Sequence, residues 1–219
     1  MNKLNINSIS TEEYQKLIEH AEILEKDTSA AKVLKLLDGS FLKLFRRKRW
    51  FSSELIYPYV KRFANNAIEL TKLAVETPQI TALYRFCSGK LNFTAVRYIP
   101  LPGITLRAAM QAATNELSKG YMSLFGDLLA NLHQQGVYFR SIHLGNVLLL
   151  PNGRLGLIDF ADMTKHSHPL SQLKRARNLK HLQRYQEDAN WLFGKYFSDF
   201  YNGYKKVAGE KASRFLRSS

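Results

Sequence analysis

Asn146 and Asp159 stand thirteen residues apart at the two ends of a predicted β-hairpin. Its apolar runs, Val147–Leu150 and Leu155–Ile158, are joined by Pro151-Asn152-Gly153, and Asn-Gly between apolar runs favours a tight turn. An amide and a carboxylate at the ends of a hairpin can converge on one hard cation such as Mg²⁺, which prefers oxygen ligands. The structural alternative is an Asn in a turn and an Asp that ends a strand.

Three neighbours of this pair could take part in proton transfer: Ser141, His143 and Asp162. A Ser hydroxyl is too weakly basic to act alone as a general base at neutral pH. His143 has a suitable intrinsic pKa, and Asp162 supplies a carboxylate. The alternatives are a packed loop histidine and a capping or salt-bridging aspartate.

The N-terminal part of the chain is expected to alternate helix and strand. The spacing of Ser10 and Glu13 predicts a capping box that opens a helix over Thr11 to about Ala21. Asp38-Gly39 between two apolar runs predicts a hairpin of two antiparallel strands. Further on, we expect these elements: strands Ala31–Leu37 and Phe41–Phe45, a helix from Glu54 to about Val75, and strands Ile80–Phe86 and Phe93–Ile99.

Pro100, Pro102 and Gly103 then interrupt regular structure and predict a hinge. After it we expect a helix from about Lys119 to Gln135, capped by Gly136, then the hairpin and a basic helical remainder. The order of elements indicates an α+β fold in two lobes. Its predicted parts are an N-terminal helix (1–22), an N-lobe with a β-sheet and one helix (23–99), a hinge (100–104) and a reduced helical C-lobe (105–219).

These segments resemble the small bacterial kinase-like proteins grouped with the lipopolysaccharide-core sugar kinases, and most closely the branch described as toluene-tolerance proteins. The resemblance is carried by Phe41–Arg49, Tyr98–Leu106, Gly136–Leu150 and Gly153–Met163. It implies a minimal two-lobed protein-kinase-like fold that binds ATP with Mg²⁺. The acceptor implied by these relatives, together with the charge of this chain, is the hydroxyl of an anionic or membrane-linked sugar.

The resemblance also implies roles for residues of the N-lobe. Lys43 would hold the α- and β-phosphates, and either Glu69 or Asn65 would orient that lysine. Backbone groups from Tyr98 to Leu101 would face the adenine. The alternative for Lys43 is an exposed lysine in a basic stretch.

The chain departs from the kinase pattern in several places, above all where that pattern has an Asp five residues before the metal-binding Asn. Here that position is Ser141, whereas Asn146 and Asp159 match the metal-binding residues. An alternative function is therefore a pseudokinase that acts as a nucleotide sensor or scaffold.

The chain of 219 residues carries 32 Lys+Arg against 18 Asp+Glu, a formal charge of +14. Such a charge predicts an anionic partner. Arg46–Arg49 precede Trp50 and Phe51, and the helical run Lys174–Arg184 holds no acidic residue, so we expect peripheral contact with the inner-membrane surface through both clusters. The alternatives are a solvated face and a nucleic acid, for which no recognised binding motif is present.

Cysteine content and hydropathy complete the expectations. The single cysteine, Cys87, excludes an internal disulfide and a multi-cysteine zinc site. The first residues carry no apolar run typical of a secretory signal, and no stretch is apolar enough to span a bilayer as a helix. We therefore expect a cytoplasmic protein, peripheral at the inner face of the membrane if the basic clusters bind there.

Overall fold

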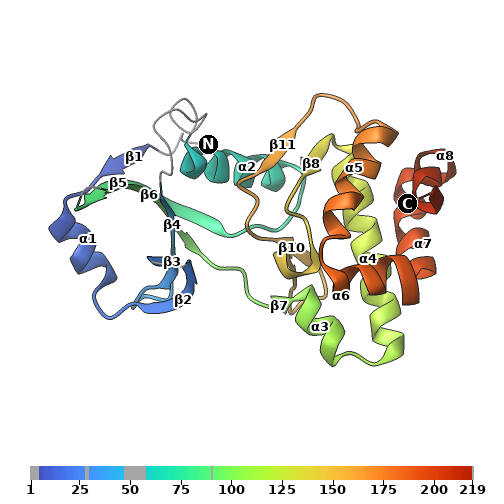
Figure 1. Cartoon of the computed structure of the whole chain (residues 1–219), viewed down its shortest axis with the longest axis horizontal. Helices are drawn as coiled ribbons and strands as arrows, with labels where there is room; N and C mark the ends of the chain where they lie inside the picture. Colours follow the sequence, from blue (N-terminus) through green and yellow to red (C-terminus); the bar gives the residue numbers. More distant parts are fainter. Residues whose placement is uncertain (1–4, 28–29, 47–57, 90, 219) are drawn as a thin grey trace. The chain divides into compact units, whose positions relative to one another are not determined.

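The computed structural model describes residues 5–27, 30–46, 58–89 and 91–218 (Figure 1). It is 48% helix and 26% strand, which confirms the predicted α+β class. The chain forms two compact units: unit 1 comprises Met1–Ile68 and Pro78–Leu101, and unit 2 comprises Glu69–Thr77 and Pro102–Ser219. The chain passes from one unit to the other at Leu101 and Pro102, inside the segment predicted as a hinge.

Unit 1 is built on a six-stranded sheet in the order β1-β5-β6-β4-β3-β2. Adjacent strands are antiparallel except for β1 and β5, which are parallel. The Asp38-Gly39 hairpin is confirmed between β3 and β4, and Gly39 has a φ of 80°, a conformation that glycine adopts without steric cost. The strands are β1 (Ile6–Ser8), β2 (Glu22–Asp27), β3 (Ala30–Lys35), β4 (Phe41–Arg46), β5 (Gln79–Ser88) and β6 (Leu91–Ile99).

Helix α1 (Thr11–Ile18) packs on one face of this sheet through Tyr14, whose ring stacks on Phe86 with centroids 4.0 Å apart. The predicted capping box is present: Ser10 N–H donates to Glu13 Oε2 (2.6 Å), and Glu13 N–H donates to Ser10 Oγ (3.0 Å). The helix ends at Ile18, three residues earlier than predicted. The N-terminal helix is thus part of the unit 1 core.

Helix α2 (Tyr59–Lys72) packs on the other face through Phe63, which lies 5.9 Å from the ring of Tyr98 and 6.4 Å from that of Phe45. The predicted helix Glu54–Val75 was too long at its C-terminal end. Its predicted beginning, residues 54–57, lies outside the described residues.

Unit 2 is mainly helical, and its two longest helices, α4 and α7, cross at glycine (Figure 1). A Cβ atom on Gly203 would lie 2.0 Å from the carbonyl oxygen of Ser123, and one on Gly126 would lie 2.3 Å from that of Phe200. The backbones therefore approach more closely than any other residue type permits. The helices are α3 (Leu106–Ala112), α4 (Asn115–Gln134), α5 (Gln172–Leu182), α6 (Gln186–Asn190), a π-helical turn η2 (Trp191–Lys195), α7 (Phe197–Ala208), α8 (Glu210–Ser213) and a final 3₁₀ segment η3 (Arg214–Ser218).

Two small sheets carry the loops of unit 2. One has the order β10-β9-β7 and the other pairs β11 with β8, all antiparallel. The Asn152-Gly153 hairpin and the Gly136 cap are confirmed, and both glycines have a φ of 76°. The sequence did not predict α3, and it placed the start of α4 four residues too late. The strands are β7 (Ile104–Thr105), β8 (Val137–Phe139), β9 (Val147–Leu149), β10 (Leu155–Leu157) and β11 (Met163–Lys165).

Candidate functional site

The loop from β8 to β9 holds most of the predicted chemistry, and apolar side chains fix it to the interior of unit 2. Ile142, Leu144 and Val147 are fully buried. The 3₁₀ turn η1 (Leu144–Asn146) leads directly into β9. Because buried apolar residues alternate with Ser141 and His143, these polar side chains are held in defined positions.

Asn146 is oriented by a hydrogen bond within this loop. Its Nδ2 donates to the carbonyl oxygen of Ser141 at 2.9 Å, so the amide orientation leaves Oδ1 at its other end as the acceptor. The carbonyl of Asn146 in turn accepts from the N–H of Ile158 at 3.0 Å. The residue before Asp159 is thus a direct neighbour of Asn146 across the hairpin.

Asp159 follows Ile158 with a φ of 54°, in the left-handed region that non-glycine residues seldom occupy. Such backbone conformations cost of order 1–3 kcal/mol and concentrate at functional sites. Here the conformation occurs two residues after β10 ends, and the negative charge of Asp159 acts on His143 in the loop that also carries Asn146.

Asp162 is the second carboxylate of the site, and it is hydrogen-bonded to Ser141. Ser141 Oγ donates to Asp162 Oδ1 at 2.7 Å. Burial raises the pKa of Asp162, and the negative charge of Asp159 raises it further. The hydrogen bond from Ser141 and the positive charge of Arg140 lower this pKa and offset part of the rise. Asp159 and Asp162 are therefore close enough to repel each other, a repulsion that a bound cation would relieve.

His143 is held as a neutral loop residue. Its Nδ1 accepts the N–H of Gly145 at 3.0 Å and lies 3.4 Å from Nη2 of Arg107, and its ring lies 4.1 Å from that of Tyr185. Burial lowers the pKa of His143, and the positive charge of Arg107 lowers it further. The negative charges of Asp188 and Asp159 raise it and offset part of this decrease. This assigns the proton to Nε2 and favours a positioning role for the ring.

Sequence reasoning missed an ion pair that supports this loop. Asp188 is fully buried and accepts hydrogen bonds from Arg107 Nε (2.8 Å), Arg107 Nη2 (3.0 Å) and the N–H of Leu144 (2.8 Å). The bidentate pair ties α3 and α6 to η1. No local signal marks it, because Asp188 follows the exposed Gln186 and Glu187 and its partner lies 81 residues away.

Two of the residues predicted to bind the nucleotide, Lys43 and Tyr98, are buried in unit 1. Lys43 lies on the sheet face that carries Phe41 and Phe45, and it is 6% exposed, so it is not the solvent-facing lysine considered as its alternative. Tyr98 is buried within β6, between β4 and β5, and strand pairing ends at Ile99, two residues before Leu101.

The two residues predicted as alternative partners of Lys43 both lie on α2 but differ in how exposed they are. Asn65 is exposed, whereas Glu69 is partly buried. Glu69, which belongs to unit 2, accepts from Lys72 Nζ at 2.6 Å.

The two basic clusters differ in what the structure shows. Arg47–Arg49 lie outside the described residues, as does the side chain of Arg46. In the other cluster, Arg175 is 3% exposed and donates to the carbonyl of Leu170 and the hydroxyl of Tyr204, both at 2.8 Å. Arg175 must therefore be removed from the predicted contact surface. Within the described ranges, no helix combines the length and apolar character needed to cross a bilayer.

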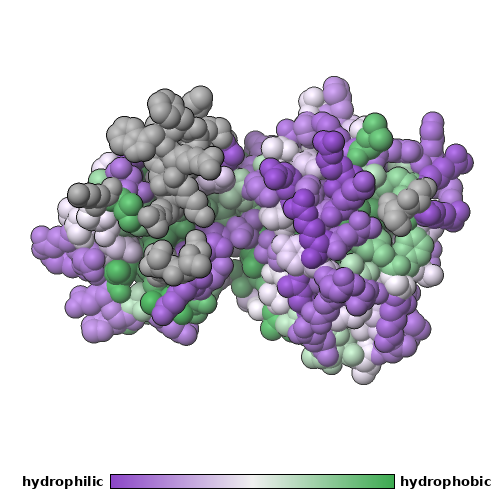
Figure 2. All heavy atoms as spheres, viewed as in Figure 1, coloured by the Kyte–Doolittle hydropathy of each residue, from purple (hydrophilic) through white to green (hydrophobic). Residues whose placement is uncertain are grey.

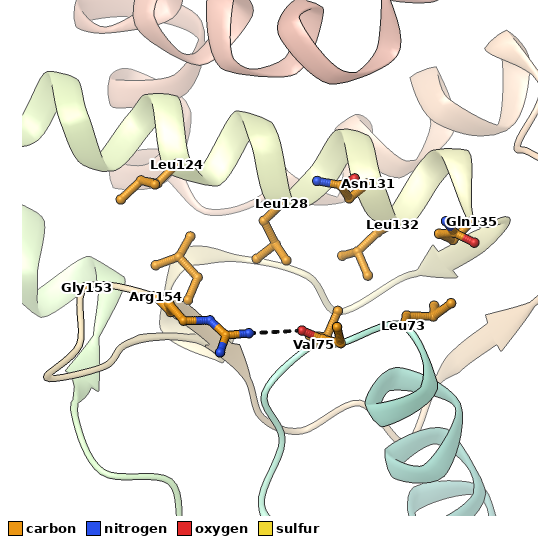
Figure 3. A pocket seen from close by; sticks show the side chains of 11 residues that line it. Leu73, Val75, Leu124, Leu128, Asn131, Leu132, Gln135, Gly153 and Arg154 are labelled. Atoms are coloured by element: carbon orange, nitrogen blue, oxygen red, sulfur yellow. Dashed lines mark hydrogen bonds between the residues drawn. The ribbon is translucent and has the colours of Figure 1, made fainter.

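A pocket of about 390 Å³ in unit 2 contains none of the predicted residues. Leu124, Leu128 and Leu132 project from α4 toward the turn around Val75 (Figure 3). Arg154 borders the pocket and is already engaged by the carbonyl of Ala74 (3.3 Å) and by Glu76 (2.8 Å). The one charged residue among the described residues of this pocket is thus paired internally, and the predicted site residues of unit 2 lie at or near the β8–β9 loop instead.

Comparison of the chain with models of known protein families finds no match, and comparison with curated proteins finds none either. Among the described side chains, no group of three or more His, Cys, Asp or Glu is placed to hold a metal ion. The residues predicted to bind Mg²⁺, Asn146 and Asp159, are one amide and one carboxylate. This is the small protein contribution that suffices for Mg²⁺ when phosphate oxygens and water complete its six ligands.

Proposed function

We propose that this protein is a kinase-like phosphotransferase that uses ATP and Mg²⁺. The observation that carries the proposal is the pair of bonds around Asn146: its Nδ2 to the Ser141 carbonyl, and its own carbonyl to Ile158 N–H. The first bond fixes the amide of Asn146, and the second joins its backbone to the residue before Asp159. Asn146 and Asp159 are the residues that would hold Mg²⁺, which supplies charge neutralisation for phosphate oxygens.

The surrounding residues support this chemistry. Asp162 accepts a hydrogen bond from Ser141, so a carboxylate is present next to the position at which the kinase pattern has its Asp. We assign Asp162 to accept the proton of the acceptor hydroxyl, because burial raises its pKa toward the working range of a general base. Lys43, buried in unit 1, is the proposed phosphate-binding cation. The proposed acceptor is an anionic or membrane-linked sugar.

The proposal is tested by titrating the full chain with MgATP in a calorimeter and by measuring transfer of labelled γ-phosphate. We expect binding that requires Mg²⁺ and is lost in Asp159→Asn, with wild-type binding in the control Asp199→Asn on α7. Absence of binding by the wild-type chain contradicts the proposal.

A second candidate function is a pseudokinase, and Ser141 is the observation that favours it. Its hydroxyl donates to Asp162 and cannot replace a carboxylate as a base. Mg²⁺-dependent ATP binding without transfer to the protein, to water or to any sugar acceptor would select this function over the enzyme.

A further inference from the structure

Two arginines beside a histidine give the C-terminal end of α5 a cationic surface. Arg177 and His181 lie on the helix four residues apart, and Arg184 follows its last residue, Leu182, by two positions. Both arginines are exposed, and no acidic residue occurs from 163 to 186. Figure 2 shows hydrophilic side chains gathered over α5, whose position is given in Figure 1. In the part of the chain that the structure describes, neither arginine forms an ion pair.

Helix α5 is fixed against β8 by the buried Asn178. Asn178 Nδ2 donates to the carbonyl oxygen of Phe139 at 2.7 Å, and Asn178 Oδ1 accepts the N–H of Phe139 at 3.4 Å. One strand position earlier, the hydroxyl of Tyr138 lies 3.1 Å from His181 Nε2. Because Arg140 directly follows Phe139 and is exposed, a third guanidinium joins those of Arg177 and Arg184.

Charge effects on His181 identify the same neighbours. Burial lowers the pKa of His181, and the positive charges of Arg184, Arg140 and Arg177 lower it further, against the negative charge of Asp162. His181 Nδ1 is buried and has no hydrogen-bond partner among the described residues. The histidine therefore sits, uncharged at neutral pH, among three positive charges, and the negative charge of Asp162 offsets only part of them.

This cluster borders the proposed active site. Arg140 directly precedes Ser141, whose hydroxyl is bonded to Asp162 at 2.7 Å. An anion held by the cluster therefore lies beside the carboxylate that we assign as proton acceptor. Lys180 lies apart from it, because it lines a separate groove with Leu173 and Phe215.

We propose that Arg140, Arg177 and Arg184 bind a phosphate monoester carried by the acceptor substrate. Guanidinium groups present planar pairs of N–H donors that match phosphate oxygens, and a phosphate dianion relieves the repulsion among three cations. This inference rests on the proposed function for the identity of the ligand as an acceptor. It narrows that acceptor from an anionic sugar to one that already carries a phosphate, free or at the head of a lipid.

The test measures binding of a hexose 6-phosphate to the full chain by calorimetry, with the unphosphorylated hexose as reference. A second arm measures sedimentation of the protein with phosphatidylcholine vesicles containing phosphatidic acid, a monoester, or an equal charge of phosphatidylglycerol, a diester. We expect Arg140→Gln, Arg177→Gln and Arg184→Gln each to weaken monoester binding about tenfold, as charge-assisted hydrogen bonds do. The matched control Lys180→Gln should change it less than twofold.

Each outcome decides the inference. If the protein binds only the soluble hexose phosphate, the ligand is a free sugar phosphate. If it binds only the vesicles with phosphatidic acid, the phosphate is carried by a lipid. Either result supports the inference. Equal binding to phosphatidylglycerol vesicles, equal losses in Lys180→Gln, or no monoester binding by the wild-type chain overturns it.

MgATP titration separates this inference from the proposed function. The arginine variants should bind MgATP like the wild type. If MgATP binds and the monoester does not, this inference fails and the proposed function stands. If the monoester binds through the arginines and MgATP does not, the proposed function fails, and with it the assignment of the ligand as an acceptor.

Discussion

Replacing Asp188 by alanine removes the residue that holds the β8–β9 loop. Asp188 is fully buried and accepts three hydrogen bonds, two from Arg107 and one from the N–H of Leu144. Removing one partner of a buried ion pair costs about 3–5 kcal/mol, because the other charge is left uncompensated. The Arg107 side chain is 27% exposed and can regain some water, so we expect the lower end, about 3 kcal/mol.

The assay is equilibrium unfolding in urea, followed by tryptophan fluorescence. Trp191 in η2 lies three residues after Asp188, and Trp50→Phe makes it the only tryptophan of the chain. In that background, Asp188→Ala should lower the free energy of unfolding by about 3 kcal/mol, a large fraction of the 5–15 kcal/mol typical of a domain. The matched control is Glu187→Ala, whose exposed carboxylate accepts from Gln111 alone among the described residues, with an expected loss below about 0.5 kcal/mol.

A double-mutant cycle sharpens this prediction. Arg107→Ala combined with Asp188→Ala should destabilise the protein by less than the sum of the two single variants, because the double variant leaves no buried charge unpaired. A loss below about 1 kcal/mol in Asp188→Ala, or strict additivity, would refute the reasoning.

Three further predictions concern buried groups of unit 2. Burial lowers the pKa of His133 to about 3, so as the pH falls below 6.5 the histidine is protonated in the unfolded state but not in the folded state. Between pH 7 and pH 5 this difference lowers the free energy of unfolding by about 2 kcal/mol. Urea unfolding at pH 7 and pH 5 should therefore show a smaller change in the free energy of unfolding for His133→Gln than for wild type. Gly203→Ala should destabilise the α4–α7 crossing by at least about 1–3 kcal/mol in thermal unfolding, whereas Gly120→Ala, with open space around it, should be neutral or stabilising by up to about 1 kcal/mol. Asp162→Asn should abolish phosphate transfer and leave MgATP affinity within threefold of wild type; equal loss of both would contradict its assignment as proton acceptor.

Local signals in the sequence predicted the elements whose stability is local. The Ser10–Glu13 capping box, the Asp38-Gly39 hairpin and the Gly136 cap depend on residues within four positions of one another, and all three are present. Strand β1 was missed, because Ile6–Ser8 is short and mostly polar and is held only by parallel pairing with β5, 77 residues further along. A partner so distant leaves no trace in the local pattern.

In the candidate site, too, local sequence signals identified some residues, whereas those that depend on distant partners were missed. Asn146, Asp159, Ser141 and Asp162 could be selected from residue types and spacing, and the structure connects them through hydrogen bonds and charge. The support from Asp188 could not be predicted, because an Asp in a polar sequence has the pattern of a solvated helix turn. The same holds for Arg175: Lys174 and Arg177 beside it are basic and exposed, and it is tertiary packing, including the bond to Tyr204, that buries it.

The most direct test of the account is the affinity of the chain for ATP, measured with Mg²⁺ and with EDTA, in wild type and in Asn146→Ala. Asn190→Ala, on α6, is the matched control. The account predicts Mg²⁺-dependent binding in wild type and Asn190→Ala, with at least tenfold weaker binding in Asn146→Ala, whose amide oxygen is lost. Binding unchanged by Asn146→Ala or by EDTA, or no binding in the wild type, would contradict it.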